Sequence, residues 1–399
     1  MKIDTDDKKI DEILTRGVGE VFVFDNLKNK LKSGIQLRIK LGFDPTGSNI
    51  HIGRAVVLRK LKAFQDLGHR AVFIVGDFTT QTGDPSDKLE KRPVLTSKKI
   101  KQNLKNYKEQ VGKIIDISKA EFKFNSKWLK KIRLQEISEL AESFSVQQMS
   151  NRRNFKERIE KGQDVSLREF MYPLMQGYDS VVVKADVEIG GFDQLFNLKA
   201  GRTIQKHFKQ KEQDIITVQM LEGTDGRKMS TSYGNVINIT DEPNQMFGKI
   251  MSLKDELIDK YFTLCTNISV EKIDKIKKDI VNKILNPKDA KMELAYEIVK
   301  IYHGEKEAKK AEEHFLKTFS RKEIPEDVQT IYVFREEKLS DILLKNNMVS
   351  SVSDFKRLID SGSITNMSDD KKVNNYNCLV KSTTVFRIGK HRFIKIEFE

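Results

Sequence analysis

The sequence predicts an α/β protein with a parallel sheet, because strand and helix patterns alternate over its first half. Residues 35–43 (IQLRIKLGF) alternate apolar and polar side chains, as a half-buried strand does. Residues 71–75 (AVFIV) form the continuous apolar run of a buried parallel strand. Apolar residues at helical spacing lie between the two strands, namely Leu58, Leu61, Phe64 and Leu67. These segments predict a βαβ unit.

Two further strands are expected at residues 186–191 and 214–221, with a helix at 194–208 between them. From residue 243 to 319 the pattern is helical only, which predicts a separate helical domain. Residues 96–131 are rich in lysine, and an amphipathic helix is expected to carry Lys98, Lys99, Lys101, Lys105, Lys108 and Lys113. The lysines of that helix are either a solvated face or an RNA-facing surface.

Length and charge limit the class of protein. The chain has 399 residues, more than the roughly 250–300 at which one hydrophobic core stops growing, so two or three domains are expected. A formal net charge of +14 favours a polyanionic partner such as nucleic acid, although it also serves solubility. The two cysteines, Cys265 and Cys378, predict neither disulfides nor a zinc site. Without a signal-like or membrane-length apolar stretch, the protein is expected to be cytoplasmic, with no membrane partner.

The turn after the first strand has the composition of a phosphate-binding corner. It contains Asp44 and Thr46, and His51, Gly53 and Arg54 then open the following helix. Free N–H groups and the positive end of the helix dipole attract phosphate, and a small glycine lets a nucleotide approach. His51 is placed to donate a hydrogen bond to a developing oxyanion. Alone, a histidine in this position is more often a cap or a surface residue.

A second element, residues 226–232 (GRKMSTS), lies between the last predicted strand and the helical domain. A mobile loop with glycine, a basic residue and hydroxyls can close over a triphosphate, and its Lys228 and Ser230 would then contact phosphate. Alone, such a segment is more often an ordinary polar loop. Together, HIGR and GRKMSTS resemble the HIGH and KMSKS signatures of class I aminoacyl-tRNA synthetases. Arg54 replaces the second histidine and Thr231 replaces the second lysine of these signatures.

Longer segments resemble bacterial tyrosyl-tRNA synthetases along nearly the whole chain. They include residues 41–53 (LGFDPTGSNIHIG), 64–88 and 169–202. Tyr172, Gln176 and Asp179 are spaced i, i+4 and i+7, which places them on one face of a helix. A buried carboxylate that accepts a phenol O–H is left unpaired by phenylalanine, and this family is the standard example of that selectivity.

The resemblance implies a role for each matching residue. Asp179 would accept the phenol O–H of tyrosine, and Tyr172, Gln176 and Asp84 would hold its ammonium group. Gln194 would lie near the carboxylate, and Asp44 and Thr46 would line the floor and the phosphate side. ATP would be bound by Gly53, Arg54, Gly191, Asp193, Lys228 and Ser230, with Thr46, His51 and Lys228 catalytic. Lys40 stands where another subgroup of the family carries a tyrosine that contacts the phenol, so that contact would depend on Asp179.

Residues from 339 onward resemble an S4-type RNA-binding domain, with two short helices, a glycine turn and strands. Its expected RNA-binding residues are Lys356, Arg357, Lys390 and Arg392, the last two in the closing turn. The alternative is a small basic cap on the helical domain. The implied domains are a Rossmann-like catalytic domain (1–235), a helical anticodon-region domain (236–325), and a linker with a small α+β S4-like domain (326–399).

The resemblance implies an enzyme that activates L-tyrosine with ATP and transfers it to tRNA(Tyr). Mg²⁺ would enter with the ATP, no tightly bound protein metal is expected, and the usual assembly of the family is a homodimer. Arg54 and Thr231 motivate one alternative, a catalytically impaired RNA-binding paralogue. Two others are a different nucleotidyltransferase with a HIGH-type corner and an enzyme that uses tryptophan.

Overall fold

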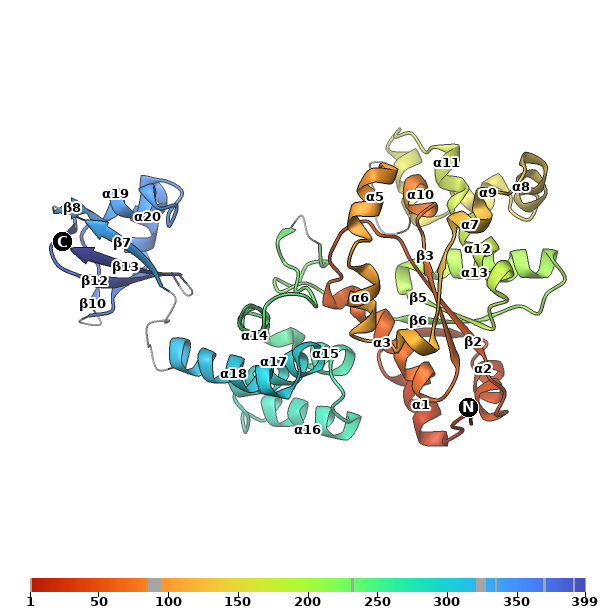
Figure 1. Cartoon of the computed structure of the whole chain (residues 1–399), viewed down its shortest axis with the longest axis horizontal. Coiled ribbons are helices and arrows are strands. Elements are labelled where there is room, and N and C mark those ends of the chain that lie inside the picture. Colours follow the sequence, from red (N-terminus) through yellow and green to blue (C-terminus); the bar gives the residue numbers. More distant parts are fainter. Residues whose placement is uncertain are drawn as a thin grey trace. The chain divides into compact units, whose positions relative to one another are not determined.

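The computed structural model describes residues 2–84, 86, 95–230, 233–320, 328–333, 336–368, 371–389 and 392–398. By its internal contacts the chain divides into two compact units, Met1–Lys309 and Lys310–Glu399, and each is described by itself (Figure 1). Among the described residues, no helix is both long and apolar enough to span a membrane.

The first unit is built on a six-stranded sheet in the order β1-β6-β5-β2-β3-β4. Its strands are β1 (Val18–Phe22), β2 (Arg38–Phe43), β3 (Arg70–Val75), β4 (Glu121–Phe124), β5 (Val187–Gly191) and β6 (Asp214–Val218). All neighbouring pairs are parallel except β1 with β6. The chain proceeds from β2 to β3 on one side, and β5 lies on the other. The order of the sheet therefore reverses at β2, where α/β proteins commonly bind ligands.

The predicted βαβ unit and the two later strands are confirmed as β2, α3 (Ile52–Asp66), β3, β5 and β6. The amphipathic helix expected for Lys98 to Lys113 is found as two short helices and not as one. The lysine-rich segment contains α5 (Ser97–Asn103), α6 (Tyr107–Gly112), η1 (Ile117–Lys119) and strand β4. Phe122 of β4 stacks on Phe73 of β3 with ring centroids 5.0 Å apart, so tertiary packing outweighs the local helical pattern. The antiparallel edge strand β1 was also not predicted.

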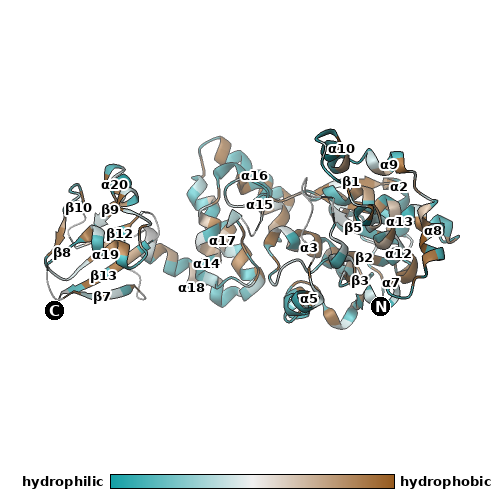
Figure 2. Ribbon diagram, turned by 90° about the horizontal axis from the view of Figure 1, so that it is seen from above, coloured by the Kyte–Doolittle hydropathy of each residue, from teal (hydrophilic) through white to brown (hydrophobic). Residues whose placement is uncertain are grey.

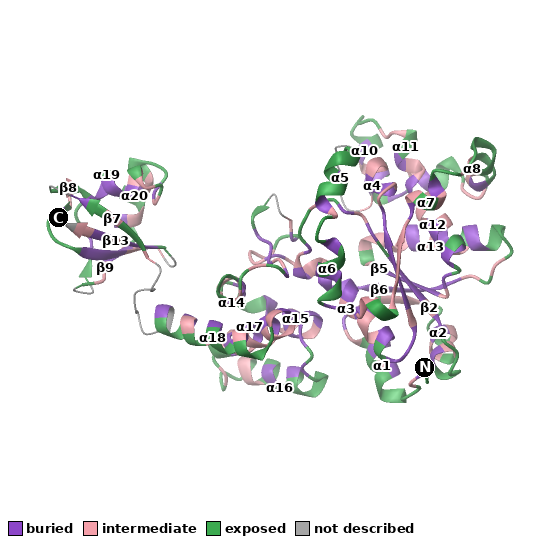
Figure 3. Ribbon diagram, viewed as in Figure 1, coloured by how far each residue is buried: buried purple, intermediate pink, exposed green. Residues whose placement is uncertain are grey.

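Helices cover both faces of this sheet, and its four central strands are largely buried (Figure 3). Helix α3 packs on one face, while α12 (Tyr172–Val183) and α13 (Leu195–His207) pack together on the other (Figure 1). Gly177 makes the close approach of α12 and α13 possible. A Cβ atom there would lie 2.7 Å from Ile204 Cδ1 and 3.1 Å from the carbonyl oxygen of Ala200. Successive residues of β2 face opposite sides, so Lys40 points toward α12.

Short helices complete the α/β part of this unit. They are α1 (Asp7–Thr15), α2 (Phe24–Lys32), α4 (Thr79–Thr82), α7 (Ser126–Leu129), α8 (Leu134–Ala141), α9 (Val146–Ser150), α10 (Arg153–Glu160), α11 (Leu167–Phe170) and η2 (Phe192–Gln194). The predicted helical segment follows, with α14 (Pro243–Met251), η4 (Asp255–Leu257), α15 (Ile258–Cys265), α16 (Val270–Val281), α17 (Pro287–His303) and α18 (Glu305–Phe315).

Two arginines attach α15 to the α/β part. The Arg16 side chain donates to the carbonyl oxygens of Thr263 and Thr266, and Arg59 of α3 donates to those of Leu264 and Thr266. A helix leaves its last carbonyl groups without intrahelical partners, and cations are favoured at that end. These contacts join the helical segment to the same helix whose N-terminus carries His51.

The second unit has its own core and a five-stranded sheet in the order β10-β9-β12-β13-β7. After η5 (Leu316–Ser320) its elements are β7 (Gln329–Val333), β8 (Glu337–Lys338), α19 (Leu339–Lys345), α20 (Val352–Asp360), β9 (Ile364–Asn366), β10 (Lys371–Lys372), β11 (Leu379–Val380), β12 (Thr384–Ile388) and β13 (Arg392–Phe398). The predicted order of two helices, a glycine turn at Gly362 and strands is confirmed. Residues 326 and 327, at the start of the predicted linker and S4-like domain (326–399), lie outside the described residues.

Candidate active site

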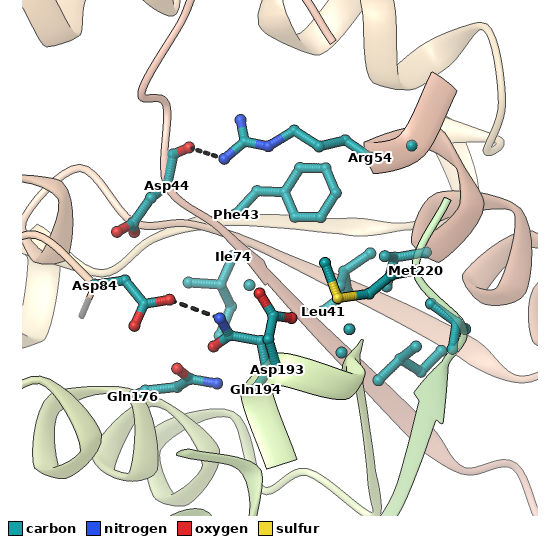
Figure 4. A pocket seen from close by; sticks show the side chains of 18 of the residues that line it. Leu41, Phe43, Asp44, Arg54, Ile74, Asp84, Gln176, Asp193, Gln194 and Met220 are labelled. Carbon is teal, nitrogen blue, oxygen red and sulfur yellow. Dashed lines mark hydrogen bonds between the residues drawn. The ribbon is translucent and has the colours of Figure 1, made fainter. Parts of the chain in front are cut away.

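A cavity of about 240 Å³ opens at the carboxyl ends of β2 and β5, where the strand order reverses. All of the residues predicted to bind tyrosine or ATP line it, except Thr46 and Ser230. Those that do are Asp44, His51, Gly53, Arg54, Asp84, Tyr172, Gln176, Asp179, Gly191, Asp193, Gln194 and Lys228. Figure 4 shows how several of these side chains surround one space. Segments far apart in the sequence therefore converge here.

His51 is the N-cap of α3, and its Nδ1 accepts a hydrogen bond from the backbone N–H of Arg54 at 3.3 Å. Burial lowers the pKa of His51 to about 3, and the nearby cations Arg54 and Lys228 act in the same direction. The imidazole is therefore neutral at physiological pH. Because Nδ1 is the acceptor, the ring proton belongs on Nε2, which leaves that nitrogen as a hydrogen-bond donor.

Gly53 keeps the start of α3 open. A Cβ atom at Gly53 would lie 3.1 Å from His51 Nδ1 and 3.2 Å from the sulfur of Met229. Glycine at this position therefore allows Met229, in the loop that carries Lys228 (the lysine loop), to pack directly against the start of the helix.

The chain after the lysine loop pairs with the chain before α3. The Ile52 N–H donates to the Ile237 carbonyl oxygen at 2.8 Å, and the Ile239 N–H donates to the Ile50 carbonyl oxygen at 3.0 Å. His51 forms an isolated antiparallel bridge with Asn238. Backbone hydrogen bonds thus hold the two signature segments beside each other.

Arg54, which replaces the usual second histidine, is held at the edge of the cavity. Its guanidinium lies over the Phe43 ring at 5.4 Å and donates to the carbonyl oxygen of Asp44 at 3.1 Å and to the hydroxyl of Tyr107 at 3.3 Å (Figure 4). Arginine keeps its charge at any physiological pH. A fixed cation therefore stands next to the N-terminus of α3.

Asn235 organises the lysine loop and was not predicted. Its side-chain oxygen accepts from the Ser230 N–H at 2.8 Å, and its amide nitrogen donates to the Lys228 carbonyl oxygen at 3.1 Å and to Asp225 Oδ1 at 2.8 Å. The Lys228 side chain is exposed, while Met229 is buried. Thr231 and Ser232 lie outside the described residues.

Asp179 also lines the cavity and is 4% exposed. It accepts hydrogen bonds from Trp128 Nε1 at 2.7 Å and from Asn125 Nδ2 at 3.3 Å. Burial raises the pKa of Asp179 to about 7, against the opposing effects of Lys40, Trp128 and Asn125. Trp128 and Asn125 were not predicted. Their segment (NSKWL) follows a strand that the sequence pattern did not identify.

Asp84 and Gln194 form a polar network beside the cavity. Gln194 Nε2 donates to Asp84 Oδ2 at 2.6 Å (Figure 4), and the fully buried Asn197 donates to Gln194 Oε1 at 3.1 Å. Asn197 was also not predicted, although it lies one helical turn after Gln194. Two other residues that line the cavity are also bonded to each other: the Tyr172 hydroxyl donates to Asp44 Oδ2 at 3.0 Å.

Lys40 does not line the cavity. It is completely buried and forms an ion pair of 2.8 Å with Glu188 behind α12. The interior of the sheet, and not the substrate space, therefore receives the side chain that replaces a phenol-binding tyrosine.

The described residues contain no group of three or more histidine, cysteine or acidic side chains arranged to hold a metal. The cavity carboxylates Asp44, Asp84 and Asp179 already accept hydrogen bonds from protein donors.

The expected RNA-binding residues lie in the second unit. Lys356 and Arg357 are on α20, where Lys356 lies over the Tyr376 ring at 5.8 Å and Arg357 pairs with Asp354 at 2.7 Å. Arg392 is the first residue of strand β13, and not part of the closing turn as predicted, because it pairs with Ile388 in the sheet. Lys390 lies outside the described residues.

Residues 32–320 match the family model described as tRNA synthetases class I (W and Y). The chain belongs to this family. It is 43% identical over 388 residues to a protein of Thermotoga maritima named tyrosine–tRNA ligase, and the match covers 96% of each chain. A protein of Carboxydothermus hydrogenoformans with the same name is 44% identical and covers 97% of each chain.

Solved structures of the same fold include the tyrosyl-tRNA synthetase of Archaeoglobus fulgidus complexed with L-tyrosine. It is 19% identical, has a TM-score of 0.61, and covers 76% of this chain and 99% of its own. A C-terminally truncated mitochondrial tyrosyl-tRNA synthetase of Aspergillus nidulans has a TM-score of 0.65 at 22% identity, over 78% of this chain and 94% of its own. The Rossmann-like fold expected from the two signatures is thus confirmed for this class I synthetase.

Proposed function

We propose that this class I synthetase is a tyrosine–tRNA ligase. It activates L-tyrosine with ATP and transfers the tyrosyl group to the 3′ end of tRNA(Tyr). Relatives of that name match over nearly the full chain. The observation that carries the choice of amino acid is Asp179, a buried carboxylate in the same cavity as His51 and Lys228.

In this proposal Asp179 recognises the phenol. As a carboxylate it accepts the phenol O–H, while Trp128 and Asn125 hold it in place from the protein side. Phenylalanine would enter the same space but leave a desolvated carboxylate without that donor. The ammonium group of tyrosine binds to Asp84, Tyr172 and Gln176. The carboxylate of tyrosine lies near Gln194, which is hydrogen-bonded to Asp84.

The opposite end of the cavity takes the nucleotide. The His51 Nε2–H, the Arg54 guanidinium, the Lys228 ammonium and the N-terminus of α3 supply donors and positive charge for the phosphates. Gly191 and Asp193, at the end of β5, line the wall assigned to the ribose. Thr46 and Ser230 do not line the cavity, and their assignment to phosphate remains a prediction.

The proposed chemistry needs no protein nucleophile. A tyrosine carboxylate oxygen bonds to the α-phosphorus of ATP as the bond to the pyrophosphate oxygen breaks, which gives tyrosyl-adenylate and pyrophosphate. A ribose hydroxyl of the tRNA then bonds to the tyrosyl carbonyl carbon, AMP leaves, and the hydroxyl proton is lost. The chain contributes positioning and stabilisation of the charge that develops on phosphate. Mg²⁺ is assigned to the ATP phosphates, where it neutralises charge, and to no residue of the chain.

The test is exchange of labelled pyrophosphate into ATP with tyrosine, tryptophan and phenylalanine in parallel. We expect exchange with tyrosine only. RNA binding without any exchange would instead support the catalytically impaired paralogue, and preference for tryptophan would overturn the assignment to tyrosine.

Binding of tRNA is assigned to the helical segment and to the S4-like module, within the domain limits 1–235, 236–325 and 326–399. A net charge of +14 supports this assignment, as do the exposed Lys356 and Arg357 on α20. Replacing both residues by serine should weaken tRNA binding. The rate of pyrophosphate exchange and the affinity for tyrosine should stay unchanged. A role in translation also implies the cytoplasmic location that we expect for this protein.

A homodimer is the proposed assembly. Leu134, Val146 and Leu167 are 80%, 78% and 80% exposed on α8, α9 and α11, where parts of α8 are coloured hydrophobic in Figure 2 and exposed in Figure 3. Large apolar side chains that are this exposed are typical of a surface that a second copy covers. Leu167→Asp should shift the protein from dimer to monomer in light scattering, whereas a wild-type monomer would overturn the proposal.

A further inference from the structure

A buried ion pair lies directly beneath the helix that carries the phenol-recognising carboxylate. Lys40 of β2 is 0% exposed, Glu188 of β5 is 1% exposed, and Lys40 Nζ is 2.8 Å from Glu188 Oε1. Burying two charges is costly, and hydrophobic side chains of similar volume often stabilise a protein as well or better. Such a pair at this place therefore calls for a role other than stability.

Both members of the pair hold α12. Lys40 Nζ donates to the Gln176 carbonyl oxygen and to Ser180 Oγ, each at 2.7 Å. Glu188 accepts from Gln176 Nε2 and from Ser180 Oγ, each at 3.1 Å, and from Gln213 Nε2. The pair thus fixes the turn of α12 that contains Asp179, since Gln176 and Ser180 lie on either side of it.

The pair also contributes charges that act on Asp179. The charged groups that act on Asp179 are Lys40 from β2 and Glu188 from β5, and the attraction of Lys40 is the larger of the two effects. Its other partners, Trp128 of α7 and Asn125 before it, are neutral hydrogen-bond donors. Burial by itself favours a neutral carboxylic acid, which would donate a hydrogen bond and not accept one from a phenol.

We propose that Lys40 is a specificity-determining positioning residue: with Glu188 it fixes the turn of α12 that carries Asp179, the acceptor of the substrate phenol. The inference rests on the proposed use of tyrosine. It assigns separate tasks to the two partners. Lys40 supports Asp179 and hence the choice of tyrosine over phenylalanine, while Glu188 orients the Gln176 side chain and hence affects the affinity for either amino acid.

The test compares Glu188→Gln with the double variant Lys40→Met/Glu188→Gln in the full-length chain. Glu188→Gln leaves Lys40 as a buried cation without its carboxylate, and the double variant removes both charges, so their difference reports the Lys40 cation in the absence of Glu188. The matched control is Lys60→Met. Lys60 is also buried and bonds the backbone carbonyl oxygens of Ile13 and Arg16, but it does not line this cavity.

The readout is kcat/KM for tyrosine and for phenylalanine in pyrophosphate exchange, from about pH 6 to about pH 9. We expect the ratio of kcat/KM for tyrosine to kcat/KM for phenylalanine to be about ten- to a hundredfold lower in the double variant than in Glu188→Gln. The activity of the double variant on tyrosine should also be displaced to higher pH. Glu188→Gln should raise KM for both amino acids with the ratio kept, and Lys60→Met should keep ratio and pH profile. Lys40→Arg, which retains the charge, should retain more of the ratio than the double variant.

Equal ratios and pH profiles in Glu188→Gln and the double variant would overturn the role of Lys40 while wild-type exchange still supports the proposed function. Absence of tyrosine-dependent exchange in the wild-type protein would overturn the proposed function itself. Melting curves show whether each variant is folded. If the methionine variant is not, Lys40→Gln/Glu188→Gln keeps a donor toward the Gln176 carbonyl oxygen and gives the same comparison.

Discussion

At the amino-acid end of the cavity Asp179 is 4% exposed and held by two side-chain donors, whereas at the phosphate end Lys228 is exposed on a loop. The first end must recognise one hydroxyl of a small substrate, so its acceptor is fixed before substrate arrives. The second must admit a triphosphate and release pyrophosphate, which suits a cation that is exposed to solvent. Selectivity and rate should therefore respond to substitutions at different ends.

The largest effect is expected at the phosphate end. Lys228→Met removes a cation that stabilises the leaving pyrophosphate, so kcat for exchange should fall about 100- to 1000-fold. Tyrosine binding, measured by equilibrium dialysis, should change little. The control is Lys254→Met, an exposed lysine close to Gly226 that does not line the cavity. A large loss of tyrosine affinity in Lys228→Met would contradict the separation of the two ends.

At the amino-acid end, Asp179→Asn keeps the shape of the side chain and removes its charge. We expect kcat/KM for tyrosine to fall about 10- to 100-fold, because a hydrogen bond to a charged acceptor is lost. Activity on phenylalanine should fall much less, and KM for ATP should stay close to wild type. Equal losses for both amino acids would indicate that Asp179 supports the fold and does not sense the phenol.

A smaller effect is expected for Trp128→Phe, which removes the indole donor to Asp179. Because that hydrogen bond lowers the pKa of Asp179, its loss should raise the pKa further above about 7. The carboxylate form exists above this pKa, so kcat/KM for tyrosine should fall as pH drops through it, and the fall should begin at higher pH in the variant. A pH profile identical to wild type would show that the contact is not functionally coupled to Asp179.

The smallest effect concerns His51. Its pKa is lowered to about 3 by burial, so the ring stays neutral above that pH and gains no proton near its ordinary value of 6.5. At saturating tyrosine and ATP, kcat should therefore show no step caused by His51 between about pH 5.5 and about pH 7.5. NMR of ring-labelled histidine measures this directly, and titration of His51 near pH 6.5 would contradict it.

The two ends also differ in how well the sequence predicts them. The Gly/Pro turn, His51 and Gly53 are adjacent in the chain, and the 3.6-residue period brings Tyr172, Gln176 and Asp179 together on α12. Trp128 and Asn125 follow strand β4, whose place in the sheet depends on packing against Phe73. Local pattern does not contain such distant contacts.

The same limit applies to Lys40, Asn197 and Asn235. A lysine within an apolar strand gives no sign of its partner, because Glu188 lies on a strand that becomes its neighbour only in the folded sheet. Asn197 and Asn235 are single polar residues whose hydrogen bonds are set by tertiary structure. Sequence therefore predicts the groups that face the substrate better than the groups that hold them.

The most direct measurement is a crystal structure with a non-hydrolysable tyrosyl-adenylate analogue. We expect the phenol oxygen within hydrogen-bond distance of an Asp179 carboxylate oxygen, and the phosphate-mimicking group near His51 Nε2 and the N-terminus of α3. An analogue bound in the reverse direction, or outside this cavity, would contradict the central claim that one cavity joins phenol recognition to phosphate activation.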